Sequence, residues 1–71
     1  MKLFRKQHKK DFLEVNDYNT LKIGDIVKIY CQETKKYIKN NYFVVKIHEN
    51  EIFLQNGNLI CVFRTDIEKL I

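Results

Sequence analysis

The sequence predicts a mainly β domain: a small barrel of about five antiparallel strands with an N-terminal helix and a C-terminal helical turn. Two observations support this prediction, the dipeptide Asn56-Gly57 and the alternation of apolar and polar residues from Tyr42 to Phe63. A two-residue hairpin loop needs positive φ, which Asn and Gly tolerate best. Alternation with a period of two indicates strands that bury one face. Together they predict an antiparallel meander over residues 42–63.

Two turns set the expected register of this meander. A loop at Asn56-Gly57 pairs Gln55 with Asn58, and a loop at Glu49-Asn50 pairs His48 with Glu51. Cross-strand partners lie on the same face of a sheet, so both turns can be combined into one assignment of faces. The predicted core face consists of Phe43, Val45, Ile47, Ile52, Leu54, Leu59, Cys61 and Phe63.

The opposite face of the meander is polar at its rim and apolar at its centre. The central residues are Val44, Phe53, Ile60 and Val62, which form a predicted protein-interface patch. An exposed apolar patch of this kind is normally covered. We expect the covering element to be the N-terminal segment, a partner protein or a second copy of the chain.

Residues 1–16 are expected to form an amphipathic helix. Phe4, His8, Phe12 and Val15 follow one another at spacings of four, four and three, which puts them on one helical stripe opposite the basic residues. Asn16 is a suitable helix end. The alternative is a basic disordered arm followed by a short strand from Phe12 to Val15.

Residues 21–71 are expected to form the barrel. A turn at Gly24-Asp25 opens a strand that places Val27, Ile29 and Cys31 on the core side. A polar loop spans residues 32–41. A C-terminal helical turn follows, with Thr65 or Asp66 as the N-cap and Glu68 completing a capping box, so that the apolar residues of the turn close one mouth of the barrel: Ile67, Leu70 and Ile71.

The order of these elements resembles the small-barrel architecture of SH3-like, KOW and Sm-like domains. The segment Leu21 to Val27 resembles the opening of the first strand of SH3-like barrels, and residues 27–30, 52–56 and 62–67 resemble parts of bacterial Sm-like RNA chaperones. Gln32-Glu33-Thr34 stands where that family has an Asn-Gly turn, and the second strand lacks the family's Gly. The resemblance therefore implies a fold and not a function.

Composition is typical of one small domain spanning residues 1–71. The chain is 45% hydrophobic and 31% charged, which suits a globular domain, and its length leaves little room for an enclosed active site. It has no secretory-type apolar segment at the N-terminus and no apolar run long enough for a membrane span. We expect a cytoplasmic protein without membrane attachment, with Cys31 and Cys61 as reduced thiols.

Sequence motifs for catalysis or metal binding are lacking. His8, Cys31, His48 and Cys61 are not spaced as paired metal ligands, and the two glycines do not form a phosphate-binding loop. No pair of carboxylates suggests acid–base chemistry. We expect a non-catalytic protein without a metal or cofactor.

Single-stranded nucleic acid is the marginally preferred partner. A net charge of +4 and a loop that interleaves lysines with tyrosines favour phosphate pairing and base stacking. Only two of the thirteen basic residues are Arg, which weakens the case for bidentate phosphate recognition. The predicted nucleic-acid-binding residues are Lys35, Lys36, Tyr37, Lys39 and Tyr42 in the loop, with Arg5, Lys6, Lys9 and Lys10 as a second basic cluster.

The alternative function is a protein-binding module. A small inhibitor or adaptor of the kind that mobile elements encode would use the patch around Phe53 or an exposed strand edge. A homo-oligomer formed through strand edges would be compatible with either function.

Overall fold

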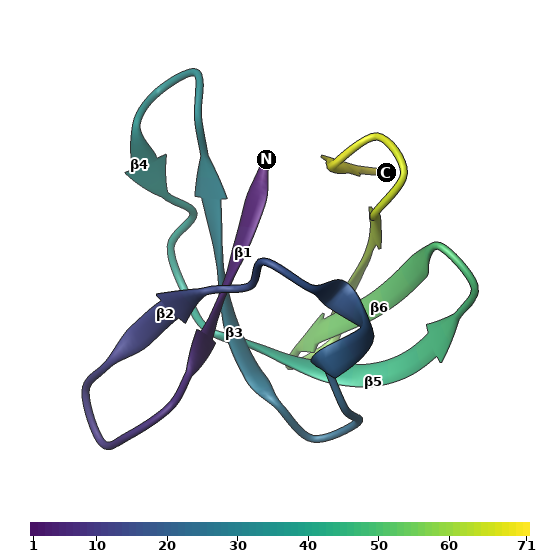
Figure 1. The fold of residues 1–71 in the computed structure, drawn as a ribbon, viewed down its shortest axis with the longest axis horizontal. Helices are drawn as coiled ribbons and strands as arrows, with labels where there is room; N and C mark the ends of the chain where they lie inside the picture. Colours follow the sequence, from purple (N-terminus) through teal and green to yellow (C-terminus); the bar gives the residue numbers. More distant parts are fainter.

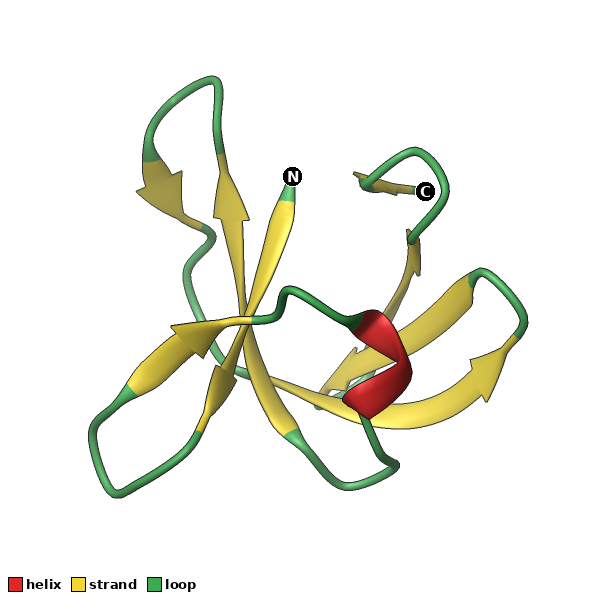
Figure 2. Cartoon of the chain, viewed as in Figure 1, coloured by secondary structure: helices red, strands yellow, loops and turns green.

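The computed structural model describes the whole chain from Met1 to Ile71 as one antiparallel sheet of eight strands (Figures 1 and 2). The only helical element is the three-residue 3-10 turn η1 (Tyr18–Thr20). The strands follow the order β2-β1-β3-β5-β6-β7-β8, and β4 pairs with β3 beside this path. Their bounds are β1 Lys2–Lys6, β2 Phe12–Glu14, β3 Ile26–Cys31, β4 Lys36–Tyr37, β5 Tyr42–His48, β6 Glu51–Asn56, β7 Leu59–Arg64 and β8 Lys69–Leu70.

The prediction of an N-terminal helix is wrong. Residues 2–14 form the β1–β2 hairpin, in which Lys6 pairs with Phe12. β1 also pairs along β3, with Leu3 opposite Ile29, and both side chains are fully buried. In this arrangement the backbone of β1 forms hydrogen bonds with β3, which a helix could not do. Strand pairing of this kind outweighs the helix-like spacing of the apolar residues in the segment.

The N-terminal segment therefore extends the sheet instead of crossing the outer surface of β5–β7. In Figure 1 the β1–β2 hairpin projects on one side of the molecule and the β5–β6 hairpin on the other. The expectation that this segment covers the second face of the meander is wrong.

The C-terminal helical turn is also absent. Residues 65–68 form a turn, and β8 pairs with β7 through Phe63–Leu70 and Arg64–Lys69. Glu68 has a φ of 46°, a left-handed conformation that interrupts a right-handed helix. Asp66 is bound by the Arg64 guanidinium at 2.8 Å and does not cap a helix.

A β-bulge in β5 changes which side chains reach the core. His48–Glu51 and Lys46–Phe53 pair in the predicted register, but the next pair is Val44–Leu54, which leaves Val45 as an extra residue. A one-residue shift turns every following side chain to the other face. Tyr42 and Val44 are therefore buried, at 5% and 0% exposure, whereas Phe43 and Val45 are exposed at 51% and 38%. The predicted faces of these four residues are wrong.

The β6–β7 hairpin keeps the predicted faces with a different register. Its loop is Gly57-Asn58, flanked by the pair Asn56–Leu59, so Ile52 pairs with Phe63 instead of Cys61. Gly57 has a φ of 58° at the first loop position, as a type II′ turn requires. A shift of two residues preserves the faces, and Ile52 and Phe63 are buried as predicted. Leu59, beside the loop, and Ile47 are exposed despite their core-face prediction.

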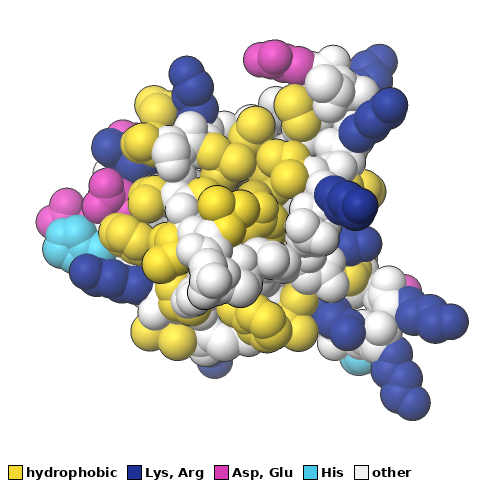
Figure 3. Space-filling model, turned by 180° about the vertical axis from the view of Figure 1, so that it is seen from behind, with side chains coloured by type: hydrophobic (Ala, Val, Ile, Leu, Met, Phe, Trp, Pro, Cys, Tyr) yellow, Lys and Arg dark blue, Asp and Glu magenta, His cyan; other side chains and the backbone are white.

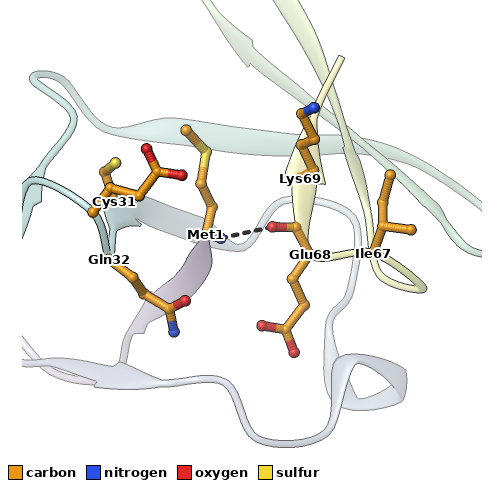
Figure 4. Close-up of a pocket in the computed structure, with 7 residues that line it drawn as sticks. Met1, Cys31, Gln32, Ile67, Glu68 and Lys69 are labelled. Carbon is orange, nitrogen blue, oxygen red and sulfur yellow. Dashed lines mark hydrogen bonds between the residues drawn. The ribbon is translucent and has the colours of Figure 1, made fainter.

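Ten apolar residues from most of the elements form a single core: Leu3, Val15, Leu21, Val27, Ile29, Tyr42, Val44, Ile52, Leu54 and Phe63. The sheet curls around them and stays open, which is compatible with a small barrel-like fold, and it has eight strands where about five were predicted. Where the start of β1 and the turn before β8 come together, the Met1 amino group donates to the Glu68 carbonyl oxygen at 2.7 Å, beside a cavity of about 440 Å³ (Figure 4).

None of the chain's helical structure has the length and apolar character that crossing a membrane requires.

Candidate nucleic-acid interface

Three aromatic rings from β1, β3 and β4 form a cluster on the outer side of the sheet. Phe4, Tyr30 and Tyr37 pack edge-to-face, with ring centroids 5.7 Å apart for Phe4–Tyr30, 5.3 Å for Phe4–Tyr37 and 5.1 Å for Tyr30–Tyr37. The alternation in β1 and β3 explains the cluster, because the buried residues Leu3 and Ile29 point to the opposite face. Tyr37 joins them because it pairs directly with Tyr30.

A lysine lies beside these rings. The Nζ of Lys28 is 4.6 Å from the ring centroid of Phe12 and 5.6 Å from that of Tyr37, within cation–π range. None of the chain's ion pairs involves Lys28, so its charge is not neutralised by a carboxylate. We call Phe4, Phe12, Lys28, Tyr30 and Tyr37 the aromatic–lysine face.

This face contains a hollow and has a basic margin. The hollow has a volume of about 370 Å³ and is lined by Lys10, Asp11, Phe12, Leu13, Lys28 and Tyr37. Lys6 pairs with Phe12 and therefore lies on the same side of the β1–β2 hairpin. Neither Lys6 nor Lys10 takes part in an ion pair, whereas Lys2 pairs with Glu14 at 3.3 Å. The result is a surface on which three unpaired lysines and the carboxylates of Asp11 and Glu14 surround one exposed ring, Tyr37, and three half-buried rings.

The structure brings together only some of the predicted nucleic-acid-binding residues. Tyr37, Lys6 and Lys10 belong to this region. Tyr42 is buried because of the bulge in β5 and has no free ring face for stacking. Lys36 pairs with Cys31 and so lies on the opposite side of the hairpin from Tyr37.

Arg5 and the other predicted lysines lie elsewhere. The guanidinium of Arg5 donates to the carbonyl oxygen of Thr20 at 2.9 Å and lies 3.8 Å from an Asp25 carboxylate oxygen, so it joins two chain segments. The remaining three lysines are exposed in turns or loops: Lys9, Lys35 and Lys39.

Sequence reasoning missed Phe4, Phe12, Lys28 and Tyr30 as site residues. The signal for two of them was present, because the alternation that buries Val27 and Ile29 necessarily turns Lys28 and Tyr30 outward. The spacing of Phe4 and Phe12 also fits a helical stripe, and this pattern obscures their positions on the adjacent strands β1 and β2.

Of the predicted protein-interface residues, Val44 is in the core, and Ile60 is exposed at 56%. Phe53 and Val62 are half-buried and pair with each other across β6 and β7. Because of the bulge, Phe43 and Val45 take the place of Val44 on this surface.

The two cysteines are free thiols in different surroundings. Hydrogen bonds from Thr34, first from its backbone and then from its side chain, lower the pKa of Cys31. Burial raises the pKa of Cys61. Three or more side chains of His, Cys, Asp or Glu nowhere come together as they would to hold a metal ion.

Comparison with known proteins gives no relative: no family model, curated protein or solved structure matches the chain.

Proposed function

We propose that this chain is a non-catalytic binding module whose aromatic–lysine face binds single-stranded nucleic acid. The observation that carries the proposal is the unpaired ammonium of Lys28 between the rings of Phe12 and Tyr37. Cations that follow a phosphate backbone, combined with aromatic rings on which bases stack, are the usual elements of single-strand recognition.

The geometry favours a single strand over a duplex. Rings on the surface of a sheet can stack only on bases that are not already stacked within a helix. Tyr37, which is 48% exposed, is the ring best placed for such contact. The lysines at the margin are flexible point charges, and they lack the planar guanidinium with which Arg binds phosphate through two hydrogen bonds. We therefore expect binding that tolerates many sequences and weakens with salt.

The fold-level resemblance to Sm-like barrels is an analogy in keeping with this proposal, but it identifies no binding residue in this chain. The proposal therefore depends on the surface formed by β1–β4 alone.

Two variants test the proposed face. Tyr37→Ala should weaken binding about tenfold, since stacking on one aromatic ring contributes about 1–3 kcal/mol per base. Lys28→Ala should weaken binding and reduce the slope of log affinity against log salt by about 0.7, the value for one lost phosphate contact on a single strand. The measurement is fluorescence anisotropy of labelled single-stranded DNA and RNA at low and physiological salt.

Lys46→Ala is the matched control for Lys28→Ala. Its Nζ also lies over a ring, 5.2 Å from the centroid of Phe53, but on β5 and β6. The control should leave both affinity and salt slope unchanged. Equal losses of affinity for Lys28→Ala and Lys46→Ala would show that the nucleic acid responds only to the total positive charge of the chain and not to the aromatic–lysine face. Absence of binding at low salt would refute the proposal.

A protein-binding role is the second candidate function. It is favoured by the apolar side chains that remain exposed on β5–β7, including Phe43 and Ile60.

A further inference from the structure

A second surface, distinct from the aromatic–lysine face, lies on the outer side of β5, β6 and β7. Phe53 pairs with Val62, and Phe43 and Ile60 both pair with Gln55, so these apolar side chains occupy two adjacent rows. Lys46 on β5 ends the first row, and its Nζ lies 5.2 Å from the ring centroid of Phe53. The bulge residue Val45 lies between the two rows on β5. We call the five apolar residues the outer patch: Phe43, Val45, Phe53, Ile60 and Val62.

The outer patch is large enough to be the centre of an interface. Phe43 and Ile60 are more than half exposed, at 51% and 56%, and Val45 is 38% exposed. An aromatic side chain buries about 150–250 Å² when fully covered, so Phe43 alone leaves about 100 Å² in contact with solvent. The whole patch reaches the order of 300 Å², the size of the largest apolar patch on a typical monomer, which is often functional. Figure 3 shows apolar side chains gathered across the middle of one face, with charged side chains at its margins.

The charges at one end of the patch have both signs. His48 pairs with Glu51, Glu51 with Arg64, and Arg64 with Lys69, which makes one row across four strands. Within the chain the Arg64 guanidinium is bound by Asp66 at 2.8 Å, whereas the Glu51 carboxylate is 4.0 Å from Arg64, at the limit of an ion pair, so Glu51 is the less satisfied of these two charges within the chain. The other end of the patch carries uncharged polar residues, Gln55 between Phe43 and Ile60 and Asn58 in the following turn.

This charge pattern is self-complementary. Consider two copies whose outer patches face each other, related by a two-fold axis that lies between them, parallel to the strands and midway between β6 and β7. In the second copy the order of the four residues of the row across the strands is then reversed. Glu51 of one copy then faces Arg64 of the other, twice per dimer, while Phe53 faces Val62. A surface that complements itself under a two-fold axis is what an isologous dimer requires. A polyanion such as a nucleic acid is a poorer occupant of this surface, because the Glu51 carboxylate at the charged end of the patch would repel it.

We propose that the outer patch is the contact surface of a homodimer, with a second copy of this chain as its occupant. The patch forms the apolar centre of the contact, and the row of charges forms one rim and fixes the orientation. The proposal is independent of nucleic-acid binding, because it uses β5–β7 and leaves the aromatic–lysine face on β1–β4 free.

Sedimentation velocity and light scattering on the purified chain, over a range of micromolar concentrations, test this proposal. The expected mass rises towards twice the 8.6 kDa of one chain. Ile60→Lys places a charge in the centre of the patch and should weaken dimerisation at least about tenfold. Leu13→Lys is the matched control, since Leu13 on β2 is equally exposed, at 57%, and should leave the dimer intact. Circular dichroism and thermal unfolding establish that each variant is folded.

A charge exchange tests the orientation. Glu51→Arg and Arg64→Glu should each weaken the dimer about tenfold at low salt, and the double variant should recover most of the loss. A monomer at every concentration would overturn the proposal and leave another protein as the occupant of the patch. A dimer that survives Ile60→Lys would also overturn it, because the contact would then lie on another surface of the chain.

Discussion

The chemical reactivity of the two cysteines is decided by their immediate neighbours. Cys31 ends β3 at the surface, and hydrogen bonds from Thr34 stabilise its thiolate and lower its pKa. Cys61 is on β7, packed against the core, where burial disfavours the charged form and raises the pKa. The thiolate is the nucleophile, so these opposite shifts predict unequal reactivity.

Near neutral pH iodoacetamide should alkylate Cys31 several-fold faster than Cys61. The reaction can be followed by mass spectrometry of peptides taken at successive times, with the pH varied to locate each titration. Thr34→Ala removes a side-chain donor and should slow the reaction of Cys31 without affecting Cys61. Equal rates for the two thiols would contradict the assignment of their surroundings.

Tyr18 links pH to stability. Burial, followed by the negative charges of Glu68 and Glu14, raises its pKa from 10.0 to about 12. Its ring packs on Phe63 with a centroid distance of 5.4 Å. Between these two pH values the unfolded chain has lost the phenolic proton and the folded chain still holds it, so stability falls as the pH rises through this window.

Tyr18→Phe should remove this part of the alkaline destabilisation. We expect urea midpoints of the two proteins to differ in their pH dependence above about pH 10, with the parent chain losing stability more steeply. Absorbance of tyrosinate in the folded protein gives the titration directly. Parallel pH profiles for the parent and the variant would contradict the raised pKa.

At the scale of the element, β5 shows how one extra residue reverses an alternation. The turn at Glu49-Asn50 correctly sets the pairing of residues 46–48, but nothing in the run Phe43-Val44-Val45 indicates which residue bulges. All three side chains are apolar, so the residue pattern is equally compatible with either face. The bulge is decided by tertiary packing, with Tyr42 and Val44 completing the core.

Val44→Ala and Val45→Ala distinguish the two assignments. Val44 is fully buried, so its truncation should lower the free energy of unfolding by about 2 kcal/mol through lost burial and a residual cavity. Val45 is exposed, and its truncation should change stability by less than about 0.5 kcal/mol. Chemical denaturation measures both values. A larger loss of unfolding free energy for Val45→Ala than for Val44→Ala would contradict the bulge, because it would mean that Val45 is the residue in the core.

The terminal elements could not be predicted from local pattern alone. Phe4, Phe12 and Val15 fit a helical stripe, yet β1 gains a full backbone ladder by pairing with β3, and Leu3 reaches the core only in that arrangement. At the other end the capping-box pattern of Thr65 and Glu68 competes with pairing between β7 and β8, and the pairing prevails. The central hairpins were predictable because their turns and alternation are local signals.

At the scale of the whole molecule, the curled sheet carries two separate surfaces. β1–β4 present aromatic rings around Lys28, and β5–β7 present the outer patch. Predicting the first surface from sequence needed the pairing of strands that are distant along the chain, which is why only Tyr37, Lys6 and Lys10 were identified there. An open sheet is compatible with both proposals, because its two halves expose different outer faces.

The most direct test of the central claim is a nuclear magnetic resonance titration of the isotope-labelled chain with a single-stranded oligonucleotide. The proposed function predicts that amide shifts change progressively on β1, β2, β3 and β4, with the largest changes around Lys28 and Tyr37, while β6 and β7 remain unaffected. Shifts confined to β5–β7, or no shifts at low salt, would contradict binding at the aromatic–lysine face.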